Sequence, residues 1–67
     1  MINSKKLKDR AKSMGIKQAD MAAALGLRQS SVNQKINNIR PMLLEEAEKL
    51  ADLLQITDDD FRAYFFA

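Results

Sequence analysis

The sequence contains no cysteine, no histidine and no tryptophan, and it has only two glycines and one proline. Without cysteine there is no disulfide and no thiolate metal site, so we expect a reducing compartment. No run of about 18 apolar residues is available to span a membrane. The N-terminal residues also lack the apolar core of a secretory signal. These absences predict a cytoplasmic protein with no metal, no cofactor and no membrane partner.

The chain offers few residues for catalysis. It has neither of the side chains that most often serve as base and nucleophile, histidine and cysteine, and it has no glycine-rich phosphate loop. The acidic run Asp58–Asp60 follows Thr57, a pattern typical of a helix start, because acids favour the positive end of the helix dipole. We therefore expect neither an enzyme nor a small-molecule ligand.

The charges are divided unevenly along the 67 residues. Residues 1–40 carry nine basic and two acidic side chains, a net charge of +7, whereas residues 41–67 carry two basic and seven acidic ones, a net charge of −5. A basic lobe that faces a polyanion is expected of a nucleic-acid-binding protein. The alternative is an ordinary solvated surface on which the charges happen to be segregated. With no linker or repeat, residues 1–67 are expected to form a single domain.

Apolar residues recur at helical spacing, and no stretch alternates as a strand does. The pattern predicts helices over about 4–14, 17–25 and 29–37, a fourth with Pro41 in its first turn, and a fifth that begins after Thr57. Asn3 or Ser4 can cap the first helix, and Gly15 suits the left-handed position after it. The fourth helix is expected to turn six residues inward: Leu43, Leu44, Ala47, Leu50, Ala51 and Leu54. The sequence thus predicts an all-α, compact five-helix bundle.

Residues 18–38 have the spacing of a helix-turn-helix. Ala22, a small residue, lies four positions before Gly26, and Val32 lies six positions after it. Gly26 is free to adopt the positive φ of a tight turn, and Ile36 continues the buried stripe of Val32. The alternative is an arbitrary pair of core helices, but the combined spacing favours the helix-turn-helix.

The outward face of the second of these helices carries amides and hydroxyls and no acid. An amide can pair with N6 and N7 of adenine through two hydrogen bonds, although for each residue a merely solvated side chain is the alternative. The predicted base-reading residues are Gln29, Ser30, Asn33 and Gln34. Residues at helix starts or near the end of this helix are predicted to contact the DNA backbone: Lys17, Gln18, Arg28, Lys35, Asn37, Asn38 and Arg40.

Four aromatic residues crowd the last seven positions. Phe61 and Phe65, one turn apart, fit a core that closes the bundle. A small bundle has little room for more rings, and exposed rings are unfavourable. We therefore expect part of this tail, formed by Tyr64, Phe65 and Phe66, to contribute a homodimer interface. A frayed terminus is the alternative.

In these features the chain resembles the lambda-repressor-like, Cro/XRE-type family of small phage and prophage DNA-binding domains, from Leu7 to about Phe61. The segments that carry the resemblance are Gly15-Ile16-Lys17-Gln18, Ala22, Gly26, Ser31 to Asn37, Arg40-Pro41, and Leu50 with Leu54-Gln55-Ile56. The resemblance implies a five-helix bundle whose third helix reads the major groove from a two-fold dimer. It also implies a phosphate contact for Gln18 and base contacts for Gln29, Ser30 and Gln34. The chain departs from the family at Asn38, where glycine is frequent, and at Ala11, where many relatives have arginine.

The function predicted is that of a sequence-specific transcriptional regulator of double-stranded DNA, a Cro-type or immunity repressor that acts as a homodimer. The alternative is a protein-interaction module on the same fold, such as an anti-repressor or an antitoxin. Such a module has no evident need for the charge of +7 on residues 1–40.

Overall fold

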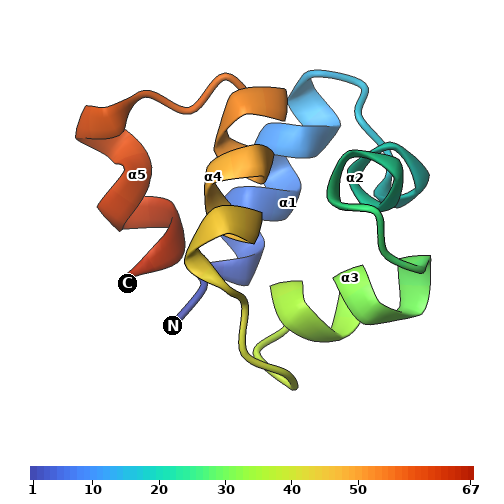
Figure 1. Ribbon diagram of the computed structural model, residues 1–67. Coiled ribbons are helices and arrows are strands. Elements are labelled where there is room, and N and C mark those ends of the chain that lie inside the picture. Colours follow the sequence, from blue (N-terminus) through green and yellow to red (C-terminus); the bar gives the residue numbers. More distant parts are fainter.

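Five helices and the short loops between them make up the whole chain. The computed structural model describes residues 1–67. The helices are α1 (Ser4–Ser13), α2 (Gln18–Leu25), α3 (Gln29–Ile36), α4 (Leu44–Leu53) and α5 (Asp58–Phe65) (Figure 1). The all-α prediction is therefore confirmed. None of these helices has the length and apolar character needed to cross a membrane.

Helix α1 begins and ends at the predicted signals. The side-chain oxygen of Asn3 accepts a hydrogen bond from the backbone N–H of Lys6 at 3.1 Å, so Asn3 rather than Ser4 is the N-cap. After the helix, Gly15 has a φ of +69°, the left-handed conformation that glycine adopts without steric cost.

Acidic side chains in the first turn mark the starts of α2, α4 and α5, whereas α3 has none. Asp20 accepts a hydrogen bond from the backbone N–H of Lys17 at 2.8 Å, and Glu46 accepts one from that of Leu43 at 2.8 Å. Helix α5 starts after Thr57 as predicted, but the Thr57 hydroxyl makes no cap bond to the backbone. It lies instead 3.4 Å from the carboxylate of Asp60.

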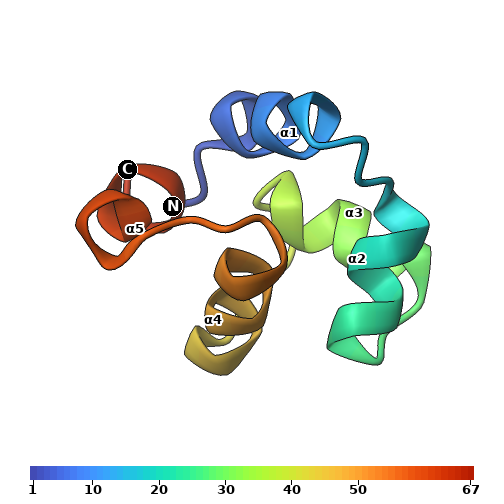
Figure 2. The same ribbon diagram turned by 90° about the horizontal axis from the view of Figure 1, so that it is seen from above.

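A single core joins all five helices. Helices α2 and α5 lie on opposite sides of the molecule, with α1, α3 and α4 between them (Figures 1 and 2). The chain ends are neighbours, and the backbone N–H of Ala67 donates to the carbonyl of Met1 at 3.0 Å. The buried apolar residues are Leu7, Ala11, Met21, Ala22, Leu25, Val32, Ile36, Ala47, Leu50, Ala51, Leu54 and Phe65.

The start of α4 differs from the prediction. Pro41 lies in the loop, because α4 begins only at Leu44. Leu43 and Leu44 were expected to face the core, but they are 56% and 59% exposed. Leu43 is the extended N-cap residue. Since helical side chains tilt toward the N-terminus, the side chain of a first-turn residue such as Leu44 points past the end of the helix.

Candidate nucleic-acid interface

Helices α2 and α3 are joined by a three-residue turn that fixes the angle between them. Gly26 ends α2 with a φ of +67°. The next residue, Leu27, donates its backbone N–H to the carbonyl of Ala22 at 3.0 Å, and Arg28 is the extended N-cap of α3. The chain therefore reverses sharply and starts α3 directly against α2.

The seam between the two helices is built from the small and branched residues that the spacing predicted. Ala22 is 4% exposed, and Val32 and Ile36 are fully buried. A short side chain at Ala22 lets α3 approach α2 closely, because a larger one would overpack the crossing. With Val32 and Ile36 turned inward, the opposite face of α3 must point outward.

That outward face carries the predicted base-reading residues. Gln29, Ser30 and Asn33 are exposed, whereas Gln34 is half-buried. No side-chain hydrogen bond within the chain engages Gln29, Ser30 or Gln34, so their polar groups remain available to an external partner. Helix α3 is thus held against the bundle by one face and presents an uncommitted polar face on the other.

A chain of amide hydrogen bonds fixes Asn33. Its side-chain oxygen accepts from the amide of Gln18 at 3.2 Å and from the amide of Asn37 at 2.8 Å. The side-chain oxygen of Asn37 in turn accepts from the ammonium of Lys8 at 2.6 Å. This chain links the start of α2 and the middle of α1 to the face of α3. No pattern in the sequence indicates this contact of Lys8.

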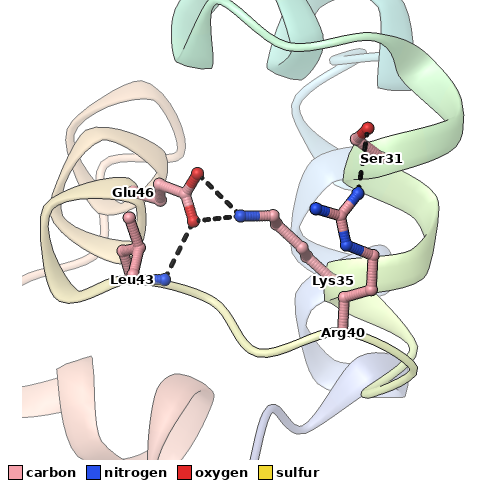
Figure 3. A network of polar contacts seen from close by, with 5 residues as sticks. All are labelled: Ser31, Lys35, Arg40, Leu43 and Glu46. Atoms are coloured by element: carbon pink, nitrogen blue, oxygen red, sulfur yellow. Dashed lines mark hydrogen bonds and ion pairs between the residues drawn. The ribbon is translucent and has the colours of Figure 1, made fainter.

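Exposed cations border the polar face of α3. Lys17 and Arg28 occupy the N-cap positions of α2 and α3. Arg40 reaches back along α3, with its guanidinium 3.4 Å from the hydroxyl of Ser31 (Figure 3). Lys8, Lys12 and Lys17 also line a hollow of about 340 Å³ beside Gln18. The polar face is therefore flanked by positive charge, as a surface that approaches a polyanion requires.

Lys35 has a different role from the one predicted. Its ammonium lies 2.7 and 2.8 Å from the two carboxylate oxygens of Glu46, and both residues are buried (Figure 3). The expectation that Lys35 contacts the DNA backbone is wrong, because its charge is enclosed between α3 and α4. Burial would raise the pKa of Glu46, but the hydrogen bonds from Lys35 and Leu43 and the charges of Lys35 and Arg40 lower it overall.

Asn37 and Asn38, also predicted to contact the DNA backbone, use their side chains within the chain. Both side-chain groups of Asn37 belong to the amide chain described above. The amide of Asn38 accepts from the backbone N–H of Ile2 at 2.8 Å and donates to the carbonyl of Ile2 at 2.9 Å. Asn38 also has a φ of +62°, which asparagine tolerates better than most residues.

The aromatic tail exposes less surface for a dimer interface than predicted. Phe65 is only 3% exposed and packs on Phe61, with ring centroids 4.7 Å apart. It therefore belongs to the core of its own chain and not to a dimer interface. Tyr64 is half-buried, with the Lys6 ammonium 5.0 Å from its ring centre. Phe66, at 56% exposure, is the one largely exposed ring of the tail.

A comparison with known families identifies the same region. A family model described as helix-turn-helix, of the Cro/C1 type, matches residues 7–61. This match covers all of α1 to α4 except the first turn of α1, and it includes the start of α5. No curated protein sequence and no solved structure gives a significant match to the chain.

Proposed function

Because this chain belongs to the Cro/C1-type helix-turn-helix family of DNA-binding, non-enzymatic domains, we propose that it is a sequence-specific repressor that reads double-stranded DNA as a homodimer. In this proposal α3 enters the major groove, and the protein is a Cro-type or immunity repressor of a phage or prophage. It prevents transcription by occupying a promoter that the polymerase needs.

One observation carries the proposal: the outward face of α3 is polar, free of acids and bordered by cations. We assign base contacts to Gln29, Ser30, Asn33 and Gln34. Gln29 and Ser30 are exposed at the start of α3, the end that enters the groove first in many helix-turn-helix complexes. Asn33 retains an amide that can donate, although its side-chain oxygen is already occupied.

Contacts to the DNA backbone are assigned to the residues that border this face. Lys17, Arg28 and Arg40 supply exposed charge. Gln18 is half-buried at the start of α2. One N–H of its side-chain amide donates to Asn33, and the other can donate to a phosphate. Three cations in each of two subunits neutralise six phosphates. Affinity should then fall about a thousandfold between about 50 and 200 mM salt.

The proposal is tested by selecting duplexes from a random library with the purified protein, followed by a salt titration on the selected duplex. We expect enrichment of a motif with two-fold symmetry and a steep loss of affinity with salt. Failure to enrich any sequence at low salt would contradict sequence-specific binding. That result would favour the alternative function, a protein-interaction module that binds another protein and not DNA.

A further inference from the structure

Asn33, on the outward face of α3, can present only hydrogen-bond donors to a partner outside the chain. Its side-chain oxygen accepts from the amide of Gln18 at 3.2 Å and from that of Asn37 at 2.8 Å. An amide oxygen has two lone pairs, and these two bonds use both. The residue is exposed, and the side-chain nitrogen of Asn33 makes no hydrogen bond within the chain. Its two N–H groups are therefore what an external partner meets.

The amide of Asn37 is oriented by two groups that can each make only one kind of hydrogen bond. The ammonium of Lys8 can only donate, so the side-chain oxygen of Asn37 faces it, at 2.6 Å. The backbone carbonyl of Asn33 can only accept, so the side-chain nitrogen of Asn37 faces that carbonyl, at 2.8 Å. On this side Asn37 offers a donor, and the Asn33 side chain must meet it with its oxygen.

We propose that Lys8, on α1, is a positioning residue for base readout: acting through Asn37, it keeps the oxygen of Asn33 turned inward, so that Asn33 reads its base pair as a donor only. The inference rests on the proposed function, since it names the base that one residue of α3 selects. The hydrogen bond from Lys8 is charge-assisted, and such bonds are about twice as strong as those between neutral groups. Lys8 thus influences base preference from a helix that does not itself enter the groove.

The base that suits a donor-only asparagine is guanine. An asparagine that can use both its groups pairs with adenine, which offers an acceptor at N7 and a donor at N6. Asn33 has no oxygen left for the N6 donor. Guanine instead offers acceptors at both N7 and O6, and a single nitrogen can donate to the two, as a lysine ammonium does. Asn33 is therefore expected to select guanine over adenine in the major groove.

The test measures the affinity of the full chain for duplexes that carry each of the four base pairs at each position of a selected site. We expect the wild type to prefer guanine over adenine about tenfold at one position, and Asn33→Ala to lose this preference there. That position is then the one that Asn33 reads. If Asn33→Ala changes the preference at no position, or if the position it affects prefers adenine in the wild type, the proposal is overturned.

Lys8→Met removes the ammonium and keeps an unbranched side chain, and Lys12→Met is its matched control. Lys12 is an exposed cation one helical turn further along α1, beside the same hollow, and its side chain makes no hydrogen bond within the chain. Both variants should weaken binding to every duplex, because each removes a positive charge. Only Lys8→Met should also reduce the preference for guanine, about threefold, as expected for the loss of one hydrogen bond. Lys8→Arg, which still donates, should keep it, and equal preferences in Lys8→Met and Lys12→Met would refute the role of Lys8.

Asn37→Asp should change which base is preferred. It replaces the donating amide of Asn37 by a carboxylate that can only accept. Asn33 must then turn its nitrogen toward residue 37 and its oxygen outward. At the position that Asn33 reads, the preference should change from guanine to a base that donates, cytosine at N4 or adenine at N6. A merely structural role of Asn37 would weaken binding without changing the base, so an unchanged preference for guanine would contradict the proposal.

Nuclear magnetic resonance of the free protein separates failure of this inference from failure of the proposed function. The side-chain amide signals of Asn33 and Asn37 should shift in Lys8→Met and stay in place in Lys12→Met. Signals that do not move in Lys8→Met would overturn the positioning role of Lys8 without any DNA. If these signals shift as expected and the wild type enriches no duplex, the proposed function fails, and with it the assignment of a base to Asn33.

Discussion

The ammonium of Lys35 and the carboxylate of Glu46 form a buried pair, with Nζ 2.7 and 2.8 Å from the two oxygens. Lys35 lies in the last turn of α3 and Glu46 in the first turn of α4. The Glu46 carboxylate also accepts a hydrogen bond from the backbone N–H of Leu43. The pair thus fixes the end of the proposed recognition helix relative to the start of α4, together with the loop between them (Figure 3).

Removing one member of this pair should destabilise the fold strongly. Lys35→Ala leaves the Glu46 carboxylate buried without its partner, and we expect a loss on the order of 3 kcal/mol in the free energy of unfolding. Urea unfolding at pH 7 measures it. The double variant Lys35→Met with Glu46→Met should recover most of this loss, because no buried charge remains. A change below about 0.5 kcal/mol for Lys35→Ala would show that the pair is not buried in solution.

The same pair should make stability depend on pH. The pKa of Glu46 is lowered in the folded protein from its ordinary value of 4.5. The ionised carboxylate therefore stabilises the fold above about pH 4.5, and this contribution is lost as the pH falls through the lowered pKa. Glu46→Gln should be less stable than the wild type at pH 7, with the difference shrinking as the pH falls below about 4.5. Urea unfolding across this range measures it, and a difference that is constant with pH would contradict the assignment.

The sequence predicted the helix-turn-helix because its spacing and its glycine are local signals. Ala22, Val32 and Ile36 repeat at helical intervals, and all three are buried. Gly26 takes the positive φ that the turn requires. Because these signals are local, the predicted bounds of α2 and α3 are each only one residue too long: α2 was predicted to include Lys17, and α3 to include Asn37.

Pairings between distant residues were not predicted, because each partner looks ordinary alone. Lys35 follows Val32 by three positions, at the edge of the buried stripe, but nothing nearby in the sequence marks Glu46 as its partner. Asn38 likewise binds Ile2 across 36 positions. The spacing of apolar residues also does not indicate which end of a helix extends beyond the core, and for this reason Leu44 was expected to be buried. Long-range packing decides these features.

Asn38 should be required both for its left-handed backbone and for its bonds to Ile2. Asn38→Ala loses both and should cost about 2 kcal/mol, whereas Asn38→Gly loses only the bonds and should cost about half as much. Thermal or urea unfolding of the two variants measures the difference. Equal losses would mean that the backbone conformation contributes nothing.

Gln55 supplies the matched control for this comparison. It has a φ of +53°, and its side chain makes no hydrogen bond within the chain; its backbone carbonyl accepts one from the Arg10 guanidinium at 3.1 Å, which a glycine at this position would keep. Gln55→Gly should therefore stabilise the protein, by about 1 kcal/mol, since glycine adopts this conformation without strain. A destabilising effect at Gln55 would show that strain at positive φ does not govern either position.

The amides of α3 should determine base preference if α3 reads the major groove. Gln29→Ala and Gln34→Ala should each cost about 1–3 kcal/mol on the selected duplex and relax the preference at one base pair. Competition with duplexes substituted at each position measures the preference. The Gln34 side chain has no hydrogen-bond partner inside the protein, so its removal should affect DNA binding and not the fold. Unchanged affinity and unchanged base preference for Gln34→Ala would therefore mean that the proposed recognition surface is misplaced.

Arg40 should act on affinity and leave base preference unchanged. Its guanidinium lies beside the hydroxyl of Ser31, at the border of the polar face, where a DNA phosphate would pass in the proposed complex. Arg40→Ala should weaken binding to all sequences alike and reduce the slope of log affinity against log salt by about one per subunit. The titration is made on a half-site duplex, so that association of two copies does not contribute to it. A changed base preference with an unchanged salt slope would place Arg40 in the groove and overturn its assignment to the backbone.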